Sequence, residues 1–179
     1  MPVLLVVFEI PESIEEQIRR LRERISGVRW KSEFSLTTNY VGEVSARQVD
    51  AACESLTELE TPRLRLLLAN AGTSTHEGVV RTLYFGLHDP APVLPLRAAI
   101  EARLEQAGIA PKRQKFNPHV TVAHLSRDCD HETLGRWIEK YEEWHSYSFE
   151  VAEIELRVTY PAEDAGGEAK TTKQSFGLR

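Results

Sequence analysis

Apolar residues recur along the chain at two spacings, and each spacing predicts one kind of secondary structure. Alternating or continuous apolar and β-branched residues are typical of strands, and they predict strands over residues 3–10, 34–41, 63–69, 79–87, 119–125, 153–160 and 170–178. Apolar residues three and four positions apart are typical of helices, and they predict helices that begin near residues 13, 45, 94 and 130. Loops rich in small and polar residues are predicted over 70–78 and 161–169.

Short polar signals mark the ends of the predicted helices. Ser13 with Glu16, and Ser45 with Gln48, have the spacing of a capping box. In such a box the two side chains accept hydrogen bonds from backbone N–H groups that the first helical turn leaves free. Gly108 is expected to end the third helix, because glycine readily adopts the left-handed conformation that follows a helix.

The same order of elements occurs twice: a strand, a helix, a second strand with a polar pair, and a second helix. The polar pair is Ser35 and Thr37 in the first half and His119 and Thr121 in the second half. The pairs begin 119 − 35 = 84 residues apart, which is close to half of the 179 residues. We interpret this as a tandem duplication with approximate repeats over 28–88 and 112–160 in one bilobal domain, and we expect both pairs to face a shared cleft.

The His-x-Thr pair is suited to phosphate chemistry. Residues two apart on a strand point to the same face, so His119 and Thr121 should project together while Val120 and Val122 enter a core. An imidazole can accept or donate a proton near neutral pH, and a threonine hydroxyl can bind a phosphate oxygen. A lone histidine on an amphipathic strand is more often an ordinary surface residue, so this short pattern needs support from its surroundings.

The residues around the pair provide some of that support. Lys112, Arg113 and Lys115 form a basic patch just before His119, although the net charge of the chain is −5. Such a patch fits a phosphomonoester or phosphodiester, and it also fits a solvated loop. His124 has the sequence parity of Val120 and Val122, so the alternation predicts that it lies at the end of the core face. The sequence contains no glycine-rich phosphate loop and no histidine pair with metal-ligand spacing.

Length, charge and cysteine content restrict the class of protein. No apolar run approaches the ~20 residues of a membrane span, and the first residues lack the basic region of a signal peptide. Cys53 and Cys129 stand alone in the sequence, which favours a reducing, cytoplasmic setting. The negative net charge argues against non-specific binding along nucleic acid.

Five stretches of the sequence resemble one family of enzymes. FNPHVTVAHL at residues 116–125 and SLTTNYVGEV at 35–44 are similar to the paired motifs of the two-histidine (2H) phosphoesterase superfamily. VFEIPESIEEQIRRL at 7–21, GVRW at 27–30 and RTLYFGL at 81–87 resemble the segments around those motifs. The similarity is greatest to the bacterial 2'-5' RNA ligase-like proteins, which are also called RNA 2',3'-cyclic phosphodiesterases, and it covers nearly the whole chain.

This resemblance implies a fold and a mechanism. The fold is α+β and bilobal, a pseudo-twofold duplication with two antiparallel sheets around a central cleft and helices outside. One motif histidine acts as a general base and the other as a general acid on a 2',3'-cyclic phosphate, the threonines hold its oxygens, and no metal or cofactor is needed. His119, Thr121 and Thr37 match the family pattern. Ser35 stands in the place of the first histidine, and His124 stands where many relatives have an arginine.

Three functions remain open at this point. The chain is a divergent phosphodiesterase in which His119 is the remaining acid–base group and Ser35 orients water or phosphate, or another histidine substitutes. Alternatively, it binds a nucleotide or RNA end without turnover, or Ser35 and Thr37 are only strand residues of a structural relic. The expected partner is a nucleotide or RNA end with a 2',3'-cyclic phosphate or phosphodiester, bound by a monomer. Hydrolysis and ligation are not distinguished.

Overall fold

Ten strands and four helices make up the part of the chain described by the computed structural model, residues 1–163 and 166–179. The strands are β1 (Val3–Glu9), β2 (Val28–Trp30), β3 (Ser35–Glu43), β4 (Leu64–Leu66), β5 (Leu68–His76), β6 (Val79–Leu87), β7 (His119–Leu125), β8 (Phe149–Val151), β9 (Glu153–Tyr160) and β10 (Lys170–Gly177). The helices are α1 (Glu12–Arg20), α2 (Ala46–Leu56), α3 (Val93–Gln106) and α4 (His131–Lys140).

Eight of these strands form one antiparallel sheet. Their order is β10-β9-β1-β3-β7-β6-β5, with β2 paired to the far end of β7, and β4 with β8 forms a separate two-stranded sheet. Strands β3 and β7 join the two halves of the large sheet through a single residue pair, Leu36 opposite Val120. The predicted α+β fold with antiparallel sheets is confirmed, and the two halves share one continuous sheet.

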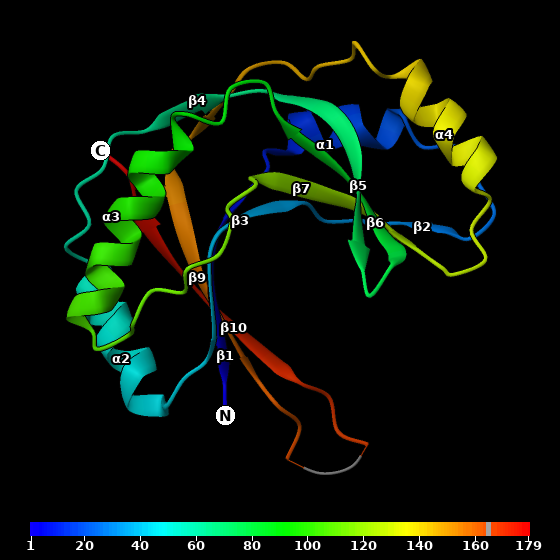
Figure 1. The fold of residues 1–179 in the computed structure, drawn as a ribbon. Coiled ribbons are helices and arrows are strands. Elements are labelled where there is room, and N and C mark those ends of the chain that lie inside the picture. Colours follow the sequence, from blue (N-terminus) through cyan, green and yellow to red (C-terminus); the bar gives the residue numbers. More distant parts are fainter. Residues whose placement is uncertain (164–165) are drawn as a thin grey trace.

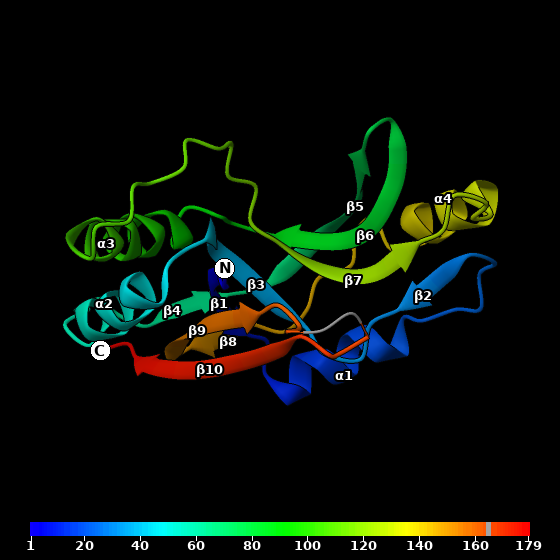
Figure 2. The ribbon, with the colours of Figure 1, turned by 90° about the horizontal axis from the view of Figure 1, so that it is seen from below.

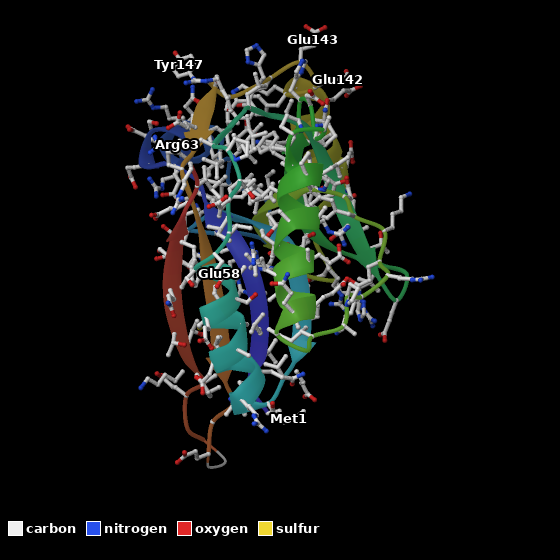
Figure 3. The ribbon with its side chains drawn as sticks, turned by 90° about the vertical axis from the view of Figure 1, so that its left-hand side faces the viewer. Met1, Glu58, Arg63, Glu142, Glu143 and Tyr147 are labelled. Atoms are coloured by element: carbon white, nitrogen blue, oxygen red, sulfur yellow. The ribbon has the colours of Figure 1, made fainter. Side chains whose placement is uncertain are left out.

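The helices lie at opposite ends of the molecule. Both ribbon views show α2 and α3 side by side at one end, while α1 and α4 lie toward the other (Figures 1 and 2). Glu58, which is labelled in Figure 3, lies just after α2. It forms a salt bridge of 3.0 Å with Arg103 on α3, which joins the first pair. The indole of Trp137 on α4 donates to the carbonyl of Leu21, just after α1, at 2.8 Å. None of these helices, within the described residues, is long and apolar enough to cross a membrane.

The alternation of apolar residues determines which face of the sheet is buried. Leu36 and Val120, the pair that joins the two halves, are both completely buried, because they point toward the helices and away from the open face. Trp137 from α4 packs on the same core, with its ring 5.9 Å from that of Phe85 on β6. Residues on either side of Leu36 and Val120 must therefore project from the opposite face.

The capping predictions succeeded at one helix and failed at another. At α2 both hydrogen bonds of the capping box between Ser45 and Gln48 are present. At α1 the helix begins at Glu12 after Pro11, and no side chain caps it. Ser13 lies inside the first turn, because proline already provides the fixed backbone angle that suits the start of a helix.

The predicted loop over residues 70–78 is wrong. Most of it belongs to β5, which pairs with β6 as far as His76 opposite Val79. Asn70 has a positive φ of 61° at a register shift in this pairing, so its polar, turn-forming character marks a bulge within the strand. The predicted loop over 161–169 follows β9 as expected, except for residues 164–165, which lie outside the described residues.

Candidate active site

The open face of the sheet brings together the two polar pairs found in the sequence. Because Leu36 lies opposite Val120 in antiparallel strands, Ser35 lies across from Thr121, and Thr37 lies across from His119. All four side chains point away from the core. Ser35, His119 and Thr121 are half-buried, and Thr37 is exposed. The four residues thus form a small square on the surface where the two halves of the sheet meet. Two hydroxyls, of Ser35 and Thr121, face each other across the strands, and the imidazole of His119 faces the hydroxyl of Thr37.

His119 is held in one orientation by its neighbours. Its Nδ1 lies 2.7 Å from the carbonyl oxygen of Asn117, and a carbonyl only accepts, so Nδ1 carries the proton. Its Nε2 is then the nitrogen that gains or loses a proton during a reaction. The ring of Tyr84 on β6 lies 4.9 Å from the imidazole at 50°. Gly72 on β5 makes room for Tyr84, since a Cβ there would come within 2.7 Å of the tyrosine hydroxyl.

A cavity of about 200 Å³ lies on the His119 side of this square. Thr37 and His119 line it, together with Tyr40, Phe116 and Asn117. Two cations cover its aromatic rings: the Arg97 guanidinium lies 4.5 Å from the ring centre of Phe116, and the Lys112 ammonium lies 5.0 Å from that of Tyr40. Lys115 also lines the cavity, whereas Arg113, although exposed on the same loop, is not among its described lining residues.

A larger cavity of about 420 Å³ lies on the Ser35 side. Arg157 on β9 points into it and donates from Nη1 to the Ser35 hydroxyl at 3.3 Å. The same guanidinium pairs closely with Glu155 and, at 3.4 Å, with Glu9. Lys31 also lines this cavity, and burial together with the charge of Arg157 lowers its pKa. The wall of this cavity thus contains three cations, Arg29, Lys31 and Arg157, and also three carboxylates, Glu9, Glu15 and Glu33.

His124 lies on this open face, so the prediction that it ends the core face is wrong. Thr121 pairs with Tyr84 and Ala123 pairs with Leu83, which leaves Val122 as an extra residue in β7. Such a bulge reverses the alternation beyond it, so Val122 and Ala123 are both buried. His124 is exposed and lines the same cavity as Ser35. Burial, followed by the charges of Lys31 and Arg29, lowers its pKa.

The sequence reading missed three residues of this face. Arg157 is on the polar side of the clean alternation in β9, but nothing in the sequence indicates that β9 lies two strands away from Ser35. Arg29 lies in the short strand β2 and Lys31 follows it directly, and the three residues of β2 are too few for a periodic signal. Among the residues that the structure describes, no group of three or more His, Cys, Asp or Glu side chains is placed to hold a metal ion.

Comparison with known proteins identifies the family. The family model described as "2'-5' RNA ligase superfamily" matches residues 4–162, which is most of the chain. The chain belongs to this superfamily. A curated relative from Aeropyrum pernix, named RNA 2',3'-cyclic phosphodiesterase, is 28% identical over 79% of this chain and 84% of its own. A relative of the same name from Methanocaldococcus jannaschii is 23% identical over 86% and 88%.

Solved structures of other proteins share the fold. The E. coli LigT protein, in a structure complexed with 3'-AMP, superposes with a TM-score of 0.70 at 20% identity and covers 99% of both chains. A protein of Thermus thermophilus superposes with a TM-score of 0.71 at 16% identity, over 99% of this chain and 98% of its own. The family membership and the 2H-type fold predicted from the sequence are thereby confirmed.

Proposed function

We propose that this protein is a 2H-type phosphoesterase that hydrolyses a 2',3'-cyclic phosphate on a nucleotide or RNA end. The observation that carries the proposal is the convergence of Thr37, His119 and Thr121 on one open face, beside the cavity into which Arg157 points. The relatives named RNA 2',3'-cyclic phosphodiesterase support the same substrate class.

The geometry suggests a role for each of these groups. The hydroxyls of Thr37 and Thr121 lie diagonally across the square, where they can donate to the two non-bridging oxygens of a phosphate between them. His119 lies across from Thr37 on the same face, and in its protonated form it can give a proton to the ribose oxygen as the P–O bond breaks. Arg157 lies on the far side, where a guanidinium can stabilise charge that develops on the phosphate.

Turnover of a 2',3'-cyclic nucleotide by the purified protein tests this proposal. We expect hydrolysis to a nucleoside monophosphate, which phosphorus NMR or chromatography detects. His119→Gln should lower kcat by ~10²–10⁴, the usual contribution of one proton-transfer group. His131→Gln is a matched control, because His131 is an exposed residue at the start of α4. A parent protein without turnover, or a His119→Gln variant as active as the parent, would contradict the proposal.

A second function is favoured by one observation, the serine at position 35. A serine hydroxyl is not an acid or a base near neutral pH, so the site could hold a phosphate without reacting with it. In that case a nucleoside monophosphate should bind, and its affinity should fall when Thr37 and Thr121 are both changed to alanine. A 2',3'-cyclic nucleotide incubated with the parent protein should stay intact. Calorimetry and the turnover assay on the same sample separate this function from hydrolysis.

A further inference from the structure

Three polar side chains follow one another along the open face of β7. His119 and Thr121 are two residues apart, and the bulge at Val122 adds His124 to the same face. At ~3.3 Å per residue the two histidine Cα atoms are separated by at most roughly 16 Å, with Thr121 between them. The two imidazoles thus lie on opposite sides of the threonine that is proposed to hold the phosphate.

Hydrolysis of a cyclic phosphate needs groups on opposite sides of the phosphorus. The attacking water and the departing oxygen lie roughly in line, so one proton-transfer group must approach from each side. His119 occupies one side. On the other side the cavity contains Ser35, which cannot act as a base near neutral pH, and His124, which can.

Resting on the proposed function, we propose that His124 is the second catalytic histidine of this protein and the general base of the reaction. Its neutral ring accepts a proton from the water whose oxygen forms a bond to phosphorus. The bond from phosphorus to one ribose oxygen then breaks, and that oxygen takes the proton carried by His119. Ser35 lies beside this path and, through its hydrogen bond from Arg157, can orient the phosphate or the water.

The surroundings of His124 favour this role. Arg29 lies opposite it on β2 and Thr82 opposite it on β6. The cavity wall adds two further cations and three carboxylates, namely Lys31, Arg157, Glu9, Glu15 and Glu33. Arg157 and Glu15 already have ionic partners, Arg157 with Glu155 and Glu9, and Glu15 with Arg19. Burial, followed by the charges of Lys31 and Arg29, lowers the pKa of His124 and so favours its neutral ring.

One substitution distinguishes a general base at position 124 from a residue that only binds the phosphate. His124→Arg supplies a permanent cation that can hold a phosphate oxygen but cannot accept a proton. His124→Gln removes both abilities while keeping a polar side chain. Because His124 is exposed, both variants should fold, and thermal unfolding followed by circular dichroism checks this directly.

The experiment measures kcat and KM for a 2',3'-cyclic nucleotide from pH 5 to 9 in the parent, His124→Gln, His124→Arg and the control His131→Gln. A base must be neutral to act, so the parent kcat should rise with pH on the acidic side of its profile. We expect kcat to fall by ~10²–10⁴ in both His124 variants, with loss of this acidic limb and a smaller change in KM. The control should match the parent.

The possible results separate this proposal from the proposed function. An arginine variant with near-parental kcat would show that His124 is a phosphate anchor, and a glutamine variant with parental kcat and pH profile would show that it has no role. Either result overturns the role of His124 while leaving hydrolysis in place. A folded parent without turnover overturns both proposals.

Discussion

A histidine introduced at position 35 provides a second test of where the missing proton-transfer group lies. Ser35 points to the open face beside Thr121, and the adjoining cavity of about 420 Å³ leaves room for an imidazole. In the His124→Gln background, Ser35→His should restore a base on the same side of the phosphate. We therefore expect the double variant to be faster than His124→Gln alone.

The size of the gain follows from the local contacts. General acid–base catalysis contributes at least ~10²-fold, which corresponds to about 2.7 kcal/mol of barrier. The substitution removes one hydrogen bond, from Arg157 to Ser35 at 3.3 Å, and a typical hydrogen bond contributes ~0.5–1.5 kcal/mol. The catalytic gain exceeds this loss by about 1.2–2.2 kcal/mol, so kcat should rise by ~8-fold to 40-fold.

The pH profile should change together with the rate. Arg157 donates to the side chain at position 35, and a cation so close should hold the pKa of the new imidazole below its ordinary value of ~6.5. The acidic limb lost in His124→Gln should therefore return, since kcat rises as the introduced imidazole loses its proton. Steady-state assays of a 2',3'-cyclic nucleotide from pH 5 to 9 measure both effects.

Two comparisons make this result decisive. Ser35→Asn in the same background introduces a polar side chain that does not titrate, and it should give no gain. Ser35→His in the parent should give only a small gain, because His124 already serves as the base. A full ~10²-fold gain in the parent, or no gain in the double variant, would refute the assignment of His124.

Three further predictions concern binding and stability. Lys112→Ala should raise KM for a cyclic nucleotide at low salt more than Arg113→Ala does, because Lys112 lines the cavity beside Thr37; equal effects would contradict this. Trp137→Ala should lower the free energy of unfolding by ~3–5 kcal/mol, measured by urea denaturation, because this side chain is 1% exposed. Ser45→Ala should cost ~1 kcal/mol in the same assay, whereas Ser13→Ala should cost nothing, because Ser13 caps no helix.

The site could be predicted from the sequence as far as strand alternation holds. Apolar residues at 36 and 120 required their neighbours to face the other way, so the sequence correctly predicted that Ser35, Thr37, His119 and Thr121 share a face. The prediction needs only the two-residue spacing of the polar pair on each strand. The capping box at Ser45 was predictable for the same reason, since its two hydrogen bonds depend only on local spacing.

The parts of the site and of the fold that the sequence did not predict depend on contacts between distant segments. Arg157 reaches Ser35 across two strand pairings, from β9 to β1 and from β1 to β3, and no local pattern encodes that path. The composition of segment 70–78 is typical of a loop, yet its backbone pairs with β6 as far as His76, and the apolar pattern of β6 is strong. Partner strands can therefore impose extended structure on residues with little preference for it.

The bulge at Val122 combines local strand alternation with contacts between distant segments. At Val120, β7 pairs with Leu36 on β3. Farther along, Ala123 pairs with Trp30 on β2, and the backbone N–H of Lys31 donates to the Val122 carbonyl at 2.9 Å. The extra residue lets one strand serve two partners whose registers differ. If the same residues paired without the bulge, they would alternate strictly, which would turn His124 toward the core and expose Leu125. The chemistry available on the Ser35 side is thus determined by a one-residue shift of the backbone as well as by the identity of the side chains.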